Sequence, residues 1–147
     1  MSLSDWHKNG WLRPHKASKE EIANLLEIVE RDLTDATAKG LSDDWKFGIA
    51  YNAALKLCTI LLHSSGYRPE KNLAHYRTLQ SLPLILGAEH DSNADYLDAC
   101  RKKRNETEYD FAGGVSEEEV DELIGFCGEL KQEVLEWLKK YHKPLLS

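Results

Sequence analysis

The sequence predicts an all-α protein, an up-and-down bundle of about five helices. Apolar residues recur at helical spacing over long stretches, and serine–glutamate capping signals stand at the start of two of them. No run alternates with period two strongly enough to predict a strand. The four prolines and nine glycines leave most of the 147 residues free to form regular helices with short connections.

The first predicted helix follows Ser18 and runs to about residue 38. Ser18 and Glu21 fit a capping box, in which the serine hydroxyl accepts from the backbone N–H of Glu21 and the Glu21 carboxylate reaches back. The second predicted helix runs from Ser42 to Gly66. Its apolar residues cover more than one face, which predicts the central helix of the bundle.

The third and fourth predicted helices cover residues 71–86 and 92–108, and Pro83 must kink or break the first of these. Ser116 and Glu119 form a second capping box, which opens the last and longest helix. That helix ends before Pro144. Its apolar stripe consists of Val120, Leu123, Ile124, Cys127, Leu130, Val134, Trp137 or Leu138, and Tyr141.

The chain divides into an N-terminal segment, residues 1–17, and a helical bundle domain, residues 18–147. A length of 147 residues suffices to bury one core, so a single bundle is expected. Trp6, Trp11 and Pro14 favour an N-terminal segment that packs on the bundle or on a partner. Partial disorder is the other interpretation of this segment.

The composition excludes several classes of protein. A net charge of −6 argues against broad electrostatic binding to nucleic acid or anionic lipid, but it is compatible with a local basic patch. The longest apolar stretch, residues 47–62, carries polar side chains and is too short to span a bilayer, so no membrane association is expected. The widely spaced Cys58, Cys100 and Cys127 predict buried, reduced thiols in a cytoplasmic protein.

No metal site and no cofactor are expected from the motifs. The six histidines never occur as His-x-x-x-His or His-Glu-x-x-His, so a metal site on one helix is unsupported. The chain also has no Gly-rich phosphate loop and no dinucleotide-binding motif.

The stretch from Arg101 to Asp110 is the best candidate for a functional site. Arg101, Arg104 and Glu108 fall three and four residues apart and therefore share one helical face. Arg104 is expected to point toward the bundle or an interface, where a guanidinium needs an anionic partner such as Asp110, Glu108 or a ligand phosphate. The simpler interpretation is a solvated basic cluster at the end of a helix, with Tyr109 packed under it.

Two further polar residues are candidates for the same site. Asn52 interrupts an otherwise apolar helix, and its amide either reaches across to Arg104 or Asn105 or lies on a more polar stripe. His75 stands beside a tyrosine and an arginine and either faces a cleft or lies at the surface.

Four short segments, taken in their order along the chain, resemble those of the HEPN domains (higher eukaryotes and prokaryotes nucleotide-binding), especially small stand-alone prokaryotic ones. The likeness extends over residues 18–138. It consists of Ala50-Tyr51-Asn52-Ala53, Gly66-Tyr67-Arg68, Arg101-x-x-Arg104-Asn105-x-x-x-Tyr109, and Val115-Ser116-Glu117-Glu118-Glu119.

The resemblance implies a helical bundle that pairs as a homodimer, with the polar motif near the dimer cleft. Many HEPN proteins are metal-independent ribonucleases whose motif is arginine, a polar residue, three more residues and histidine. Arg104 and Asn105 match the first two positions, but Tyr109 takes the place of the histidine. A tyrosine with an ordinary pKa near 10 is a poor general base at neutral pH, which argues against the usual nuclease route.

The resemblance and the residues together leave three hypotheses. In the first, Arg101, Arg104, Asn105, Tyr109 and Asp110, with Asn52, bind a nucleotide, an RNA phosphate or a small nucleotidyltransferase partner, as HEPN relatives do in toxin–antitoxin or defence systems. In the second, the protein is a divergent ribonuclease in which Arg104 stabilises the phosphorane charge and Tyr109 or His75 transfers protons. In the third, the motif is a structural network that fixes the register of a dimer. The missing histidine favours the first and third.

Overall fold

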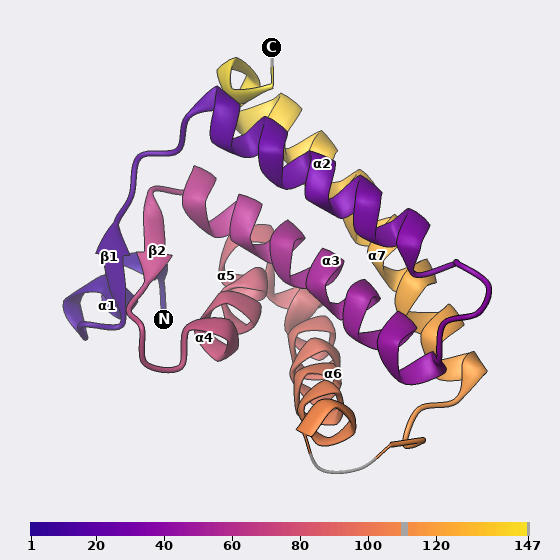
Figure 1. Ribbon diagram of the computed structural model, residues 1–147. Helices are drawn as coiled ribbons and strands as arrows, with labels where there is room; N and C mark the ends of the chain where they lie inside the picture. The colour runs from indigo at the N-terminus through magenta and orange to yellow at the C-terminus, as the bar shows by residue number, and fades with distance from the viewer. Residues whose placement is uncertain (110–111, 147) are drawn as a thin grey trace.

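The computed structural model describes residues 1–109 and 112–146, with the side chains of residues 108 and 109 outside that description. Its architecture is an all-α helical bundle, as the sequence predicts. In Figure 1, α2 (Lys19–Asp35) and α7 (Glu117–Tyr141) lie alongside α3 (Asp43–Ser64). The short helices α4 (Ala74–Gln80) and α5 (Leu82–Leu86), and α6 (Asp91–Tyr109), lie on the other side of α3.

Helix α3 forms the centre of the core, as its apolar composition predicts. Its largest fully buried side chains lie on several faces because α2, α6 and α7 all pack against it. These side chains are Phe47, Tyr51, Leu57, Ile60, Leu61 and Leu62. The hydroxyl of Ser42 caps the first turn by accepting from the backbone N–H of Trp45 at 3.2 Å.

The two expected capping boxes have different outcomes. At α7 the box is complete, since Ser116 accepts from the N–H of Glu119 and the Glu119 carboxylate accepts from the N–H of Ser116. At α2, Ser18 accepts from the N–H of Glu21, but the Glu21 carboxylate contacts His15 and His63. The sequence therefore predicts the cap of α2 correctly and the direction of one carboxylate wrongly.

The third predicted helix is broken, as Pro83 requires, but it starts later than expected. Leu73 has a positive φ of 58°, and α4 begins directly after it rather than at residue 71. The break falls at Ser81, and Pro83 then occupies the first turn of α5, where a missing N–H costs no hydrogen bond.

The prediction that the chain has no strand is wrong in one place. Leu12–Pro14 (β1) pairs antiparallel with Tyr67–Pro69 (β2) in a two-stranded ribbon. Each strand has only three residues, too few for an alternating pattern to stand out in the sequence. The ribbon attaches the N-terminal segment to the end of α3 (Figure 1).

The N-terminal segment packs on the bundle through a few side chains, while most of its residues are exposed. Helix α1 (Leu3–Lys8) buries Trp6, and Leu12 is buried with Leu62 of α3. The guanidinium of Arg77 on α4 lies 3.8 Å from the ring centroid of Trp11, close enough for a cation–π contact. Aromatic side chains and one arginine thus attach this segment to α3 and α4.

The three cysteines are buried and form no disulfide bond, as predicted. Burial raises the pKa of Cys58 to about 12, of Cys127 to about 12 and of Cys100 to about 11, which keeps these thiols protonated and unreactive. Within residues 1–109 and 112–146, no helix is long and apolar enough to cross a bilayer.

Candidate functional site

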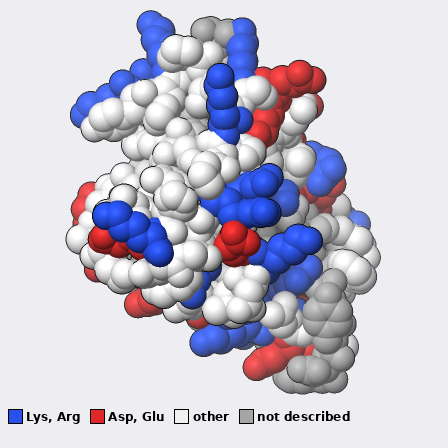
Figure 2. Space-filling model, turned by 90° about the vertical axis from the view of Figure 1, so that its left-hand side faces the viewer, with Lys and Arg blue, Asp and Glu red and all other residues white. Residues whose placement is uncertain are grey.

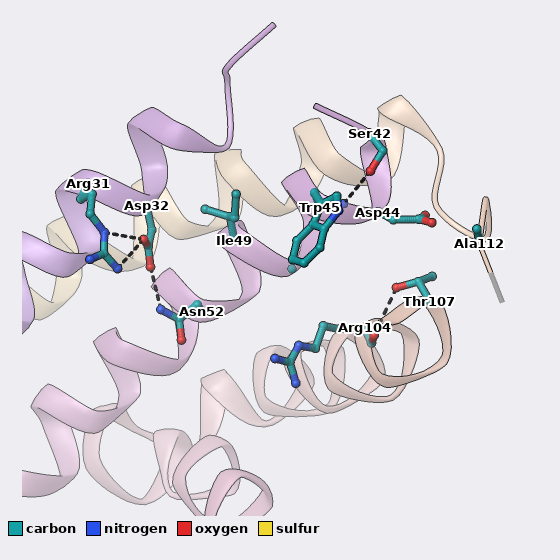
Figure 3. A pocket seen from close by; sticks show the side chains of 11 residues that line it. Arg31, Asp32, Ser42, Asp44, Trp45, Ile49, Asn52, Arg104, Thr107 and Ala112 are labelled. Atoms are coloured by element: carbon teal, nitrogen blue, oxygen red, sulfur yellow. Dashed lines mark hydrogen bonds and ion pairs between the residues drawn. The ribbon is translucent and has the colours of Figure 1, made fainter. Parts of the chain in front are cut away.

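A cavity of about 540 Å³ opens between α2, α3 and the C-terminal half of α6 (Figure 3). We call it the Arg104 pocket. Its size lies within the range of small-molecule sites in proteins. It is lined by Arg31, Asp32, Ser42, Asp44, Trp45, Gly48, Ile49, Asn52, Arg104, Thr107 and Ala112.

Arg104 reaches the pocket across a small residue of α3. A Cβ at Gly48 would lie 3.9 Å from Cγ of Arg104, so the aliphatic stem of the arginine runs beside this glycine. The guanidinium lies 5.9 Å from the ring centroid of the buried Tyr51. As Figure 3 shows, the Arg104 side chain extends from α6 into the space in front of α3. A cation is therefore held at the wall of the pocket with its stem packed.

Asn52 and Asp32 form the opposite wall, where α2 meets α3. The amide nitrogen of Asn52 donates to Oδ2 of Asp32 at 2.7 Å, and Arg31 donates to Oδ1 from Nε and Nη2 at 3.0 Å each. Asp32 is 4% exposed, so its charge is desolvated and depends on these donors. Asn52 thus lies in the predicted site, but it is fixed by a carboxylate of α2.

The rim of the pocket carries an exposed aromatic ring. Trp45, in the first turn of α3, is 62% exposed and lies on the wall between Ser42 and Asn52 (Figure 3). Beside it, the Asp44 carboxylate accepts from the backbone N–H of Gly113 at 2.8 Å and closes this end of the pocket. A large exposed indole beside an arginine is a surface on which a planar ring can stack.

The other arginine of the motif has a partner on its own helix. Arg101 donates from Nε to Asp98 at 2.8 Å, and its guanidinium lies 5.8 Å from the ring centroid of Tyr76. The Asn105 side-chain oxygen accepts from Nη1 of Arg104 at 3.4 Å, a long hydrogen bond. Arg101 and Asn105 are therefore close to Arg104 but do not line the pocket.

Three positive charges, which we call the His75 cationic cluster, act electrostatically on His75 of α4. The cluster consists of Lys56, Arg101 and Arg104. Partial desolvation lowers the pKa of His75, and the positive charges of Arg104, Lys56 and Arg101 lower it further. His75 itself is exposed, so the structure places it at the surface beside the motif. Its imidazole is held in the neutral form at neutral pH.

Positive charge also extends beyond the motif. Figure 2 shows lysine and arginine side chains gathered over the face that carries α1, β1, β2 and α4, where aspartate and glutamate are sparser. This local basic surface coexists with a net charge of −6. The sequence allowed such a patch but could not locate it, since its residues come from separate elements.

Two predicted site residues are not placed. The backbone of Tyr109 ends α6, but its side chain and the whole of Asp110 lie outside the described residues. Sequence reasoning missed Arg31, Asp32 and Trp45, which line the pocket. No local signal distinguishes them, because charged residues in an amphipathic helix and an aromatic residue in the first turn of a helix are ordinary.

Comparisons with protein-family models, with curated proteins and with solved structures find no match to this chain. The fold and the pocket geometry are therefore the observations on which a functional conclusion rests.

Proposed function

We propose that the protein binds a nucleotide, free or as part of an RNA strand, in the Arg104 pocket. The observation that carries this proposal is the pairing of a cation with an exposed aromatic ring in one cavity. Arg104 and Trp45 line the same 540 Å³ space from α6 and α3. A nucleotide carries a phosphate, which a guanidinium binds, and a base, which an aromatic ring stacks against.

The phosphate end of the ligand is assigned to Arg104. A guanidinium offers several N–H donors in a plane, and a phosphate accepts two of them at once. Lys56 and Arg101, the other two members of the His75 cationic cluster, add positive potential for a second phosphate or for a continuing strand. Arg31 contributes a further cation on the opposite wall, where Asp32 partly neutralises it.

The base end is assigned to Trp45. Stacking of a base on an aromatic side chain contributes about 1–3 kcal/mol and tolerates any base, because every base has a π-face. The polar side chains of Asn52 and Asp32 lie in the same pocket and offer hydrogen-bonding groups to the edge of a base or to a ribose. This division of roles is compatible with the nucleotide binding that the HEPN resemblance implies.

Binding is tested by titrating the protein with AMP in a calorimeter and with a fluorescein-labelled single-stranded RNA by anisotropy. Arg104→Ala is expected to weaken binding about tenfold or more, because it loses a charged contact of about 1.5–3 kcal/mol. Trp45→Ala is expected to weaken binding about fivefold or more, because it loses a stacking contact of about 1–3 kcal/mol. Lys102→Ala is the matched control, since it removes a positive charge from the same helix at a side chain that is 68% exposed. Equal affinities for Arg104→Ala and Lys102→Ala would contradict the proposal.

A second candidate function, metal-independent RNA cleavage, is favoured by one observation. His75 lies within the field of three cations, and its lowered pKa leaves a neutral imidazole that can accept a proton from a ribose hydroxyl. Arg104 would then stabilise charge on the phosphorane. Incubation of RNA with the protein in EDTA tests this: cleavage should be lost in both His75→Ala and Arg104→Ala, and absence of cleavage by the wild type rejects it.

The remaining implications of the HEPN resemblance stay predictions. These are a homodimer, a small nucleotidyltransferase partner and a toxin–antitoxin or defence role. Light scattering after size-exclusion chromatography tests the dimer. If Arg104→Ala yields a monomer and no nucleotide binds to the wild type, the motif is a structural dimerisation network instead of a ligand site.

A further inference from the structure

Two histidines and a glutamate meet at the end of the molecule opposite the Arg104 pocket. Nε2 of His15 lies 2.8 and 3.0 Å from the two carboxylate oxygens of Glu21, and Nδ1 of His63 lies 2.8 Å from one of them. One donor atom of each residue can be chosen so that all three lie within 4.8 Å of one another. One carboxylate therefore faces two imidazole nitrogens at once.

The three residues come from separate segments that the fold holds together. His15 follows β1, and its backbone N–H donates to the carbonyl of Gly66 at 2.9 Å. Glu21 lies in the first turn of α2, and His63 lies in the last turn of α3. The two imidazole rings are 4.2 Å apart between centroids and tilted by 44°. The donor atoms are thus positioned by backbone contacts and not only by their own hydrogen bonds.

We propose that His15, Glu21 and His63 bind one zinc ion through Nε2, a carboxylate oxygen and Nδ1. Two histidines and a glutamate are a donor set that zinc accepts, with a fourth position left open. Bond lengths of about 2.0–2.1 Å in a tetrahedron put neighbouring ligand atoms about 3.3 Å apart. Oε2 of Glu21 lies 3.0 Å from Nε2 of His15 and 2.8 Å from Nδ1 of His63, so these two contacts need to lengthen by about 0.3–0.5 Å when the ion replaces the shared protons.

The open position would face a neighbouring cavity of about 380 Å³. His15 and His63 line this cavity together with Ser64, Tyr141 and His142. A water molecule in this cavity would be the fourth ligand. The ion would connect the end of the β-ribbon, the start of α2 and the end of α3, three segments that are otherwise joined here by hydrogen bonds.

Arg68 acts against a cation at this site. Its positive charge acts electrostatically on the imidazole of His63. A bound zinc ion would carry a net charge of +1 with Glu21, so removal of the Arg68 charge should strengthen binding. A variant that lacks this arginine is therefore expected to bind zinc more tightly. Damage to the fold would weaken binding, so a gain in affinity cannot be explained by misfolding.

Zinc binding is measured by calorimetry on untagged, EDTA-treated protein titrated with ZnCl₂, and Co²⁺ serves as a second probe through its visible absorption. We expect one equivalent bound by the wild type. Binding should be about tenfold or more weaker in His63→Gln and in Glu21→Gln, and stronger in Arg68→Ala. His7→Gln is the control, because His7 is exposed on α1. The buried, protonated cysteines do not compete for the ion.

The circular dichroism spectrum of each variant verifies that the helices persist. A wild-type protein that takes up no zinc, or a His15→Gln/His63→Gln double variant that binds it as tightly as the wild type, would overturn the proposal. The same holds if Co²⁺ gives the weak absorption of a six-coordinate aqueous ion at saturation. In each of these cases the three residues form a hydrogen-bonded cluster without a metal.

Discussion

The amide nitrogen of Asn52 lies 2.7 Å from Oδ2 of Asp32 and joins the central helix to α2. This hydrogen bond fixes one wall of the Arg104 pocket, which both residues line. Because Asp32 is buried and charged, the bond contributes more than a neutral pair at the surface would.

Asn52→Ala is expected to lower the free energy of unfolding by about 1.5–3 kcal/mol, since it removes a donor from a desolvated carboxylate. The measurement is urea unfolding followed by circular dichroism. Asn105→Ala is the comparison, because among the described residues the side chain of Asn105 accepts one long hydrogen bond of 3.4 Å, and it should cost less than about 1 kcal/mol. A smaller effect for Asn52→Ala than for Asn105→Ala would show that the wall is not held by Asp32.

The second prediction concerns Tyr51, where a substitution is expected to stabilise the protein. Its hydroxyl oxygen is buried and has no hydrogen-bond partner among the described residues, and burial raises the pKa of the phenol far above its ordinary value against the opposing charges of Arg101 and Arg104. Tyr51→Phe keeps the packed ring and removes the unsatisfied polar atom. We expect the free energy of unfolding to rise by about 1 kcal/mol.

The control for this substitution is Tyr51→Leu, which also removes the hydroxyl but leaves space where the ring was. It should destabilise the protein by about 2–4 kcal/mol, as other losses of a buried aromatic ring do. Thermal unfolding of both variants separates the two effects. If Tyr51→Phe destabilises as much as Tyr51→Leu, the hydroxyl has a stabilising role that the structure does not show.

The sequence predicted the helices well and the site only in part, for identifiable reasons. Capping signals at Ser18, Ser42 and Ser116 depend on residues three positions apart, so local sequence determines them. The carboxylate of Glu21 goes elsewhere because His63, 42 positions away, competes for it. No local pattern carries that information.

The same limit applies to the Arg104 pocket. Arg104 and Asn52 could be singled out because a polar residue on an apolar helical face is unusual. Asp32 and Trp45 could not, because an acidic residue in an amphipathic helix and an aromatic residue in a first turn are ordinary. Their role depends on the packing of α2 and α6 around α3, which is a tertiary property.

The complete capping box of α7 supports a third prediction. Ser116→Ala removes the acceptor for the N–H of Glu119 and should cost about 1 kcal/mol. Glu118→Ala changes the same exposed turn without touching the cap and should cost less than about 0.5 kcal/mol. Chemical unfolding of both variants gives the comparison. Equal losses in the free energy of unfolding would mean that the hydrogen bond of the cap does not stabilise the helix more than a first-turn charge does.

The fourth prediction concerns the pH dependence of stability of the zinc-free protein. The pKa of His63 is lowered from 6.5 in the folded state, so just below pH 6.5 the unfolded chain binds a proton at this residue and the folded chain does not. This proton uptake favours the unfolded state. The pKa of Glu21 is lowered from 4.5, and its stabilising effect is therefore present above pH 4.5 and lost as the pH falls further. Both effects act in the same direction, and the free energy of unfolding should fall as the pH is lowered from 7 to 4.

His63→Gln removes the first of these contributions while the amide can still donate to Glu21. We expect the decrease in stability between pH 7 and 5 to be smaller in His63→Gln than in the wild type, with the remaining slope due in part to His75, whose pKa is also lowered. The measurement is urea unfolding at a series of pH values in the presence of EDTA. An unchanged slope in His63→Gln would mean that this imidazole takes up its proton as readily in the folded chain as in the unfolded one.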